Sequence, residues 1–289
     1  MFLQLVVSGI SQGAIYALVA LSLTLVYRAT TIVNFGHGDF VMAGAFVVYV
    51  FVILAGMPFL PAALLAFALL FALGLAIQRG FIEPIKAGPH IGFAMMSIAL
   101  GYVLRGVARA GWGREVLPMP RVFDFPPIFL GELVVTGESL VIVGVVAVLL
   151  AVFFVVFYRT RTGKMIQAVY QSERGAALVG INVRRFHCIM WGFGVALGAV
   201  GGVLVAPFTL LHPDLGASFL IRGFAAMTLG GFGSLWGAVA GGLLLGIAEQ
   251  QLGAYVSTKL IDIAAYLVII AVLVVRPVGL FGRVAAVRV

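Results

Sequence analysis

Long apolar runs, broken by short polar interruptions, follow one another along the whole chain. Runs of roughly 18 or more apolar residues are long enough to cross a hydrocarbon core of about 30 Å as helices. The runs are continuous and do not alternate with polar positions, which favours helices over the strands of a membrane barrel. Because only helices and closed barrels satisfy backbone polar groups in lipid, the pattern predicts an all-α integral membrane protein.

The polar interruptions divide the chain into eight or nine predicted spans, which form a polytopic helical bundle. A single transmembrane domain is therefore expected over residues 1–289. Segment 217–229 is short and is either a half-helix or a full crossing, so the number of spans depends on it. The other predicted spans cover residues 2–27, 40–55, 60–77, 91–107, 140–157, 188–207, 235–248 and 260–275.

One interruption, residues 109–138, differs from the others in composition. It contains four prolines, which rule out a long helix, and its charges nearly balance. Two short apolar pieces, 128–130 and 133–135, predict a small β-hairpin within it.

The most basic interruption is residues 159–187, with six Lys and Arg residues against the single acid Glu173. Loops enriched in Lys and Arg face the cytoplasm, and the basic C-terminal tail is expected there too. Counting 217–229 as a crossing then places the N-terminus and loop 109–138 outside. If 217–229 is re-entrant, this parity fails and one assignment must change.

Composition agrees with this reading. Hydrophobic residues make up 63% of the chain and charged residues 10%, whereas soluble domains carry about 25% charged residues. The net charge of +8 gathers in the loops between spans, so it does not indicate nucleic-acid binding. The first run has no basic leader or cleavage pattern and is expected to remain as a span. The lone Cys188 cannot form an internal disulfide.

Neither a nucleotide site nor a metal site is predicted. A phosphate loop needs glycines, a lysine and a hydroxyl residue at fixed spacing, and Gly163-Lys164-Met165 lacks that pattern. The chain is therefore not expected to be an ATPase. The histidines are scattered and have no second ligand at metal-binding spacing.

A polar stretch next to the second predicted span contains Asn34, Phe35, His37 and Asp39. Ionisable residues near the membrane interior are candidates for function, which makes these residues part of a gate or a proton relay. The alternative is a tight turn, in which Asn34 caps one helix and Asp39 lies near the positive end of the next helix dipole.

Glycines recur at four-residue spacing late in the chain. Such faces let helix backbones approach closely in lipid, which predicts tight packing within a bundle or a dimer. The candidate packing positions are Gly194, Gly198, Gly202, Gly233, Gly237 and Gly241.

The basic loop contains a predicted short helix outside the membrane, residues 172–179. Ser172 suits its N-cap, Glu173 its first turn and Gly180 its C-terminal stop. Ala176, Ala177 and Leu178 give it a small apolar face that fits a groove on a partner protein. A solvated connector is the alternative.

The chain resembles the permease subunits of ABC importers of the branched-chain amino acid type. The matching stretches cover the chain in the family's order, and only Gly36 and Trp236 depart from the commoner Ala and Pro. These stretches are residues 13–18, 34–39, 42–45, 173–184, 229–238, 243–249 and 276–282.

The resemblance implies a complex in the bacterial inner membrane. A second permease subunit forms a heterodimer with this chain, two cytoplasmic subunits bind ATP and Mg²⁺, and a periplasmic protein delivers the solute. Helix 172–179 would be the coupling helix that docks on an ATP-binding subunit.

The resemblance implies that branched-chain or other hydrophobic amino acids are translocated, and similar permeases import urea, short amides or aromatic carboxylates. A stand-alone secondary transporter or channel is the rival from another class, and it would favour ionisable residues inside the bundle. Arg105, Glu249 and Asp262 are instead expected at span ends. A membrane enzyme is disfavoured because no catalytic set converges.

Overall fold

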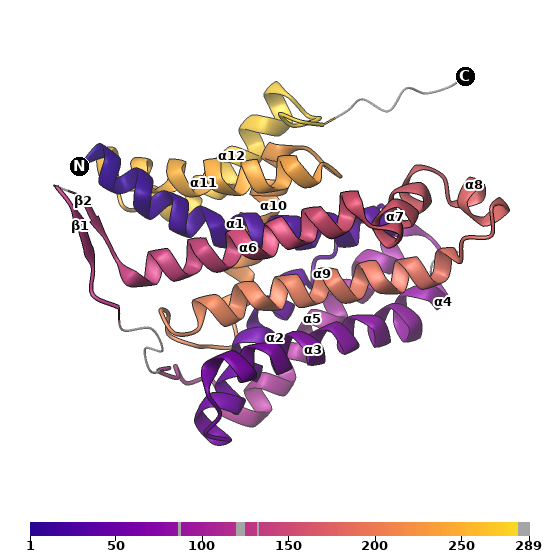
Figure 1. The fold of residues 1–289 in the computed structure, drawn as a ribbon, viewed down its shortest axis with the longest axis horizontal. Helices are drawn as coiled ribbons and strands as arrows, with labels where there is room; N and C mark the ends of the chain where they lie inside the picture. The colour runs from indigo at the N-terminus through magenta and orange to yellow at the C-terminus, as the bar shows by residue number, and fades with distance from the viewer. Residues whose placement is uncertain (86–87, 120–124, 132, 283–289) are drawn as a thin grey trace.

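The computed structural model describes residues 1–85, 88–119, 125–131 and 133–282. They form a bundle of helices that run roughly alongside one another, with one small hairpin at the N-terminal end (Figure 1). The long helices are α1 (Phe2–Thr30), α2 (His37–Tyr49), α3 (Phe59–Ile77), α5 (His90–Trp112), α6 (Gly137–Arg159), α9 (Val183–Val205), α10 (Leu215–Gly230), α11 (Leu235–Tyr255) and α12 (Leu260–Val275).

Shorter elements extend or connect these helices. Two π-helical turns continue α2 and α3, and they are η1 (Val50–Leu54) and η2 (Gln78–Ile82). The short helices are α4 (Glu83–Ile85), α7 (Arg161–Gln171) and α8 (Glu173–Leu178), and the strands are β1 (Ile128–Leu130) and β2 (Leu133–Val135).

The described part of the chain contains six helices long and apolar enough to cross a membrane. Helices α10 and α11 meet this criterion only as a pair bent by 119°, which raises the number to seven if the pair is one span, and α12 is a shorter apolar helix. The multi-pass helical bundle is therefore confirmed, whereas these criteria do not by themselves give eight or nine crossings.

The predicted hairpin is confirmed. Strands β1 and β2 pair antiparallel, with Ile128 opposite Val135. The side chain of Gln4 bonds both backbone groups of Val134, since its Nε2 donates to the carbonyl at 2.7 Å and its Oε1 accepts from the N–H at 2.9 Å. The hairpin is thereby attached to the first turn of α1.

Helix α1 lies in the centre of the bundle, where every residue from Gly13 to Val26 is buried. Its glycines let α11 approach closely, since a Cβ on Gly9 would lie 2.6 Å from the Cα of Ile247 and one on Gly13 would lie 2.9 Å from the Gly242 carbonyl oxygen. Backbone-to-backbone contact of this kind gives dispersion attraction where lipid supplies no hydrophobic drive.

The six glycines expected at packing faces also lie at close approaches. A Cβ on Gly202 would collide with the Val41 carbonyl of α2, and one on Gly241 would collide with the Ala226 carbonyl of α10. Gly194 faces Val26, and Gly198 faces His37. Gly237 faces the Gly230 carbonyl, whereas Gly233 lies beside the Tyr170 hydroxyl and has a φ of 77°.

Candidate functional site

The polar stretch before α2 lies inside the bundle. Asn34, His37 and Asp39 are almost fully buried, and only Phe35 is exposed. Asn34 Oδ1 accepts a hydrogen bond from the Gly36 N–H at 3.0 Å, and Gly36 is the N-cap residue of α2. Asp39 occupies the first turn of α2, as the tight-turn alternative expected.

The beginning of α2 is well removed from the end of α1. His37 Nε2 lies 2.7 Å from the hydroxyl of Ser22, which belongs to α1 and precedes its end at Thr30 by two turns. The connection between the two helices therefore turns back into the bundle. The described residues offer no partner to His37 Nδ1 or to the side-chain amide nitrogen of Asn34, so this buried polar cluster is incompletely satisfied.

The first turns of α2 and α10 meet in this interior region. A Cβ on Gly38 would collide with the carbonyl of Gly216, and a Cβ on Gly216 would collide with the carbonyl of Gly38. Two positive helix-dipole ends thus lie close together, which favours nearby negative charge. Asp39 in α2 and Asp214, the N-cap residue of α10, supply it.

Helix α5 provides a cation for each of these acids. Arg105 Nε lies 2.5 Å from Asp39 Oδ1, and Arg109 Nη2 lies 2.7 Å from Asp214 Oδ1. The Asp39 side chain is only 2% exposed, whereas that of Asp214 is 56% exposed. The two pairs therefore form a ladder that runs from the interior of the bundle to its surface.

A further buried ion pair joins α10 to α11 and α1. Arg222 Nε lies 3.0 Å from Glu249 Oε1, and the Tyr16 hydroxyl donates to Glu249 Oε2 at 2.7 Å. Gln12 Nε2 donates in turn to the Tyr16 hydroxyl at 3.1 Å. The Glu249 carboxylate is thus satisfied from two sides, as a buried charge requires.

These groups place a row of polar residues along one face of the bundle. Asp214, Ser218 and Arg222 recur every four residues along α10, so they share one face of that helix, and all three are exposed or half-buried. Arg105 and Arg109 of α5 adjoin this row through their acidic partners. We call these five residues the polar stripe.

The polar stripe is a poor surface for contact with lipid. Charged residues within membrane helices face a bundle interior or a water-filled cavity, because hydrocarbon does not solvate them. The stripe also includes the acid Asp214, whose side chain is mostly exposed in the isolated chain. This face can therefore line an aqueous pathway or contact another polar protein surface.

The expectation that Arg105 and Glu249 merely occupy span ends is wrong. Both lie inside their helices, α5 and α11. Arg105 pairs with the nearly buried carboxylate of Asp39, and the nearly buried carboxylate of Glu249 pairs with Arg222. Asp262, by contrast, does lie in the first turn of α12. The sequence signal that could have indicated these buried pairs is a single charged residue within an apolar run, as at Arg222.

The basic loop folds into α7 and α8. Ser172 Oγ accepts a hydrogen bond from the Gly175 N–H at 3.0 Å, which confirms the predicted N-cap, and Glu173 occupies the first turn. Gly180 follows the helix with a φ of 82°, a left-handed conformation that suits glycine.

The apolar face of α8 differs from the expected one. Ala176 is buried against the protein, whereas Ala177 is exposed and the Leu178 and Val179 side chains are 89% and 75% exposed. Two large apolar side chains therefore project from the loop. Exposure of these apolar side chains to water is unfavourable, so a partner protein that covers them would stabilise the loop.

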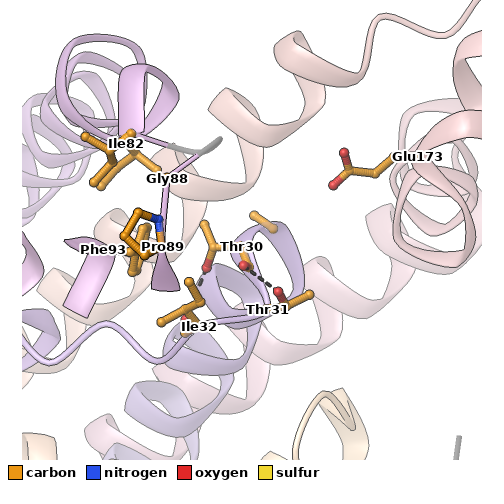
Figure 2. A pocket seen from close by; sticks show the side chains of 10 residues that line it. Thr30, Thr31, Ile32, Ile82, Gly88, Pro89, Phe93 and Glu173 are labelled. Carbon is orange, nitrogen blue, oxygen red and sulfur yellow. Dashed lines mark hydrogen bonds between the residues drawn. The ribbon is translucent and has the colours of Figure 1, made fainter. Parts of the chain in front are cut away.

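A pocket of about 150 Å³ lies between α8 and the bundle. Figure 2 shows Glu173 of α8 on one side, with Thr31 and Ile32 after α1 and Pro89 and Phe93 at the start of α5 on the other. Glu173 Oε1 also lies 3.4 Å from His187 Nε2 of α9. Helix α8 thus contacts α9 through Glu173 and faces the ends of α1 and α5 across the pocket.

No three potential metal ligands gather among the residues that the structure describes. That the chain holds no cofactor of its own stays a prediction.

Comparison with known proteins gives a full-length match. The family described as the branched-chain amino acid transport system permease component matches residues 5–275. The high-affinity branched-chain amino acid transport permease LivH of Salmonella typhimurium is 29% identical, and the alignment covers 98% of this chain and 96% of the relative. Its counterpart BraD of Pseudomonas aeruginosa is also 29% identical, with the same coverage.

A solved structure shares the fold. It is described as PsaBC from Streptococcus pneumoniae in complex with Fab, and it superposes with a TM-score of 0.50 at 17% sequence identity. The superposition covers 96% of this chain and 92% of that one. At this level of identity, the likeness concerns the arrangement of the helices.

Proposed function

Because the chain belongs to the permease components of branched-chain amino acid transport systems, we propose that it is the membrane-spanning subunit of an ATP-driven importer. Its substrates are branched-chain or other hydrophobic amino acids, which it passes across the bacterial inner membrane. The observation that carries this proposal is the match over residues 5–275, since it includes the spans, the polar stripe and the basic loop. ATP is bound and hydrolysed by partner subunits.

Two surfaces of this chain support the proposed partners. A second permease subunit covers the polar stripe, and the solute passes between the two subunits along it. Two cytoplasmic ATP-binding subunits hold ATP and Mg²⁺, and one of them receives α8. A periplasmic binding protein delivers the solute at the opposite end of the bundle.

We propose nine crossings, with the N-terminus outside and the C-terminus inside. The two ends of α10 support this count. Leu211, just before α10, exchanges backbone hydrogen bonds with Leu117 in the proline-rich loop. The Gly230 carbonyl, at the end of α10, accepts from the N–H of Phe281 beyond α12. Helix α6 is a candidate span that runs from that loop to α7, and Gly233 after α10 lies beside Tyr170 of α7. The two ends of α10 therefore lie at opposite ends of a span, which supports a crossing by α10.

Helix α8 is the proposed coupling helix. Its exposed Leu178 and Val179 enter a cleft of the ATP-binding subunit, and its Glu173 faces the ends of α1 and α5 across the pocket. Closure of the ATP-binding pair would push α8 and thereby shift these helices relative to one another. The bundle would then alternate between inward-facing and outward-facing states.

Competition for uptake tests the substrate class. Proteoliposomes that contain the assembled transporter and its binding protein should accumulate labelled leucine, and excess unlabelled isoleucine or valine should suppress it strongly. Urea, a short amide and an aromatic carboxylate should leave uptake unchanged. Preferential suppression by one of these three would assign the transporter to another substrate class of the same family.

One observation favours a second candidate function. Ionisable residues do lie inside the bundle, as Asp39 and Glu249 show, and a secondary transporter would need such residues for ion coupling. Uptake by this chain alone, driven by a proton or sodium gradient without ATP, would support that function.

A further inference from the structure

A polar cavity of about 500 Å³ is lined by no residue of the polar stripe or of α8. It is formed where the end of α1, the corner between α6 and α7, and the turn between α10 and α11 come together. Its lining includes Arg28, Tyr158, Tyr170, Gln171, Ser234 and Trp236. We call it the Arg28 cavity.

Arg28 is a half-buried cation that lacks a counter-charge in the described part of the chain. Its Nε donates to the carbonyl of Gly233 at 2.7 Å. Its guanidinium carbon lies 4.4 Å from the ring centroid of Tyr170 and 5.6 Å from that of Phe157. These contacts fix the side chain but leave its two terminal amino groups without a described hydrogen-bond acceptor.

The cavity offers no negative charge to complement Arg28, since none of its lining residues is acidic. A guanidinium presents its terminal N–H groups as a planar fork that matches the oxygens of a phosphate or a carboxylate. The Arg28 cavity is therefore suited to an oxyanion, with the neutral donors Tyr158, Gln171 and Ser234 nearby.

The position of the cavity selects the source of that oxyanion. Arg28 lies in the last turn of a membrane span, and Tyr158 and Trp236 at the cavity are partly exposed, as aromatic residues are at a membrane–water interface. Val148 and Val155 lie on the same face of α6 as Tyr158, and all three side chains are exposed. An apolar surface thus leads directly to a cationic pocket.

We infer that the Arg28 cavity binds the phosphate of an anionic phospholipid from the cytoplasmic leaflet, while the acyl chains lie along the exposed face of α6. Basic pockets between membrane helices on the cytoplasmic side are suited to anionic head groups. The choice of leaflet rests on the orientation proposed above. The bound lipid would brace α7 against the α10–α11 turn, because both contribute to the cavity wall.

The test measures lipid retention by the assembled transporter. Native mass spectrometry of the complex, purified in mild detergent from a membrane that contains phosphatidylglycerol, should show retained phosphatidylglycerol. Arg28→Gln should reduce retention several-fold, and Arg28→Lys should restore part of it. Arg161→Gln changes an exposed arginine at the start of α7 that does not line the cavity, and it should retain lipid like the wild type.

A second variant protects the test against misfolding of Arg28→Gln. Gln171→Glu introduces a carboxylate at an exposed lining position and leaves the Arg28 contacts with Gly233 and Tyr170 in place. It should expel phosphatidylglycerol as well, because the new carboxylate repels phosphate and pairs with Arg28.

Three outcomes would overturn the inference. Wild-type retention in Gln171→Glu would show that lipid binds elsewhere. Displacement of the lipid by millimolar inorganic phosphate would identify a site for free anions. Loss of the ATP-binding subunits from Arg28→Gln, with lipid retention unchanged, would identify a carboxylate of that subunit as the partner. None of these readouts requires transport, so the inference and the proposed function can fail separately.

Discussion

Buried acidic residues inside the bundle are tolerated because each is paired with a residue of opposite charge. Glu249 is nearly inaccessible to solvent, and it is satisfied by both Arg222 and Tyr16. Removal of one member of a buried ion pair leaves the other member uncompensated and typically costs about 3–5 kcal/mol. The pairs of α10 therefore couple the conformation of this helix to α1, α5 and α11.

The first prediction concerns the buried pair. Glu249→Gln should lower the melting temperature of the purified complex markedly, because it leaves the Arg222 charge without its partner. The double variant Arg222→Met with Glu249→Met should recover much of the loss. Glu115→Gln, at an exposed position in the loop 109–138, should shift stability by no more than about 0.5 kcal/mol. A wild-type melting temperature for Glu249→Gln would show that the pair contributes no stability.

The second prediction concerns close helix packing. Gly202→Ala places a methyl group against the Val41 carbonyl, so α2 and α9 must separate, and overpacking of this kind costs about 1–3 kcal/mol. The yield of monodisperse protein in size-exclusion chromatography should fall. Gly144→Ala in α6 meets open space and should behave like the wild type. Equal yields for the two variants would contradict the packing assigned to Gly202.

At the scale of elements, the pattern and length of apolar runs identified the helices but not where each helix begins within the bundle. The span 260–275, the hairpin and the Ser172 cap all follow from local patterns, because each depends on neighbouring residues alone. The re-entry of the chain before His37 depends instead on contacts with Ser22, which is distant in sequence. Arg105 and Glu249 were likewise misplaced at span ends, because their partners Asp39 and Arg222 are 66 and 27 residues away in sequence and no local pattern shows them.

The third prediction concerns α8. Leu178→Asp and Ala177→Trp should abolish stimulation of ATP hydrolysis by the loaded binding protein, because a charge or a bulky ring cannot enter a preformed apolar cleft. The bundle should still fold, since both side chains are exposed. Leu178→Met keeps an apolar side chain of similar volume and should remain coupled. Normal stimulation and uptake in Leu178→Asp would favour the solvated connector.

The fourth prediction concerns the α10–α11 pair. In a Cys188→Ala background, a cysteine at Thr258 should react with an impermeant reagent from the periplasmic side, as should one at Glu115. A cysteine at Ser172 should react only from the cytoplasmic side. Periplasmic labelling at Glu115 together with cytoplasmic labelling at Thr258 would mean that α10 and α11 form one broken span.

At the scale of the whole molecule, the distribution of polar groups divides the surface into three parts. Most of the long helices expose apolar side chains that suit lipid, such as Leu64, Val103 and Val148. The polar stripe suits a partner subunit and an aqueous pathway, and α8 projects from one end. In the proposed importer, the polar stripe and α8 are the two surface types that other subunits cover.

The energy source of transport tests the central proposal most directly. The chain is reconstituted with its second permease, ATP-binding subunits and binding protein, and uptake of labelled leucine is followed with ATP inside the proteoliposomes and ionophores present. The account predicts accumulation that requires hydrolysable ATP, persists when ion gradients are collapsed, and disappears in Leu178→Asp. Accumulation that continues without ATP and collapses with the ion gradient would contradict it.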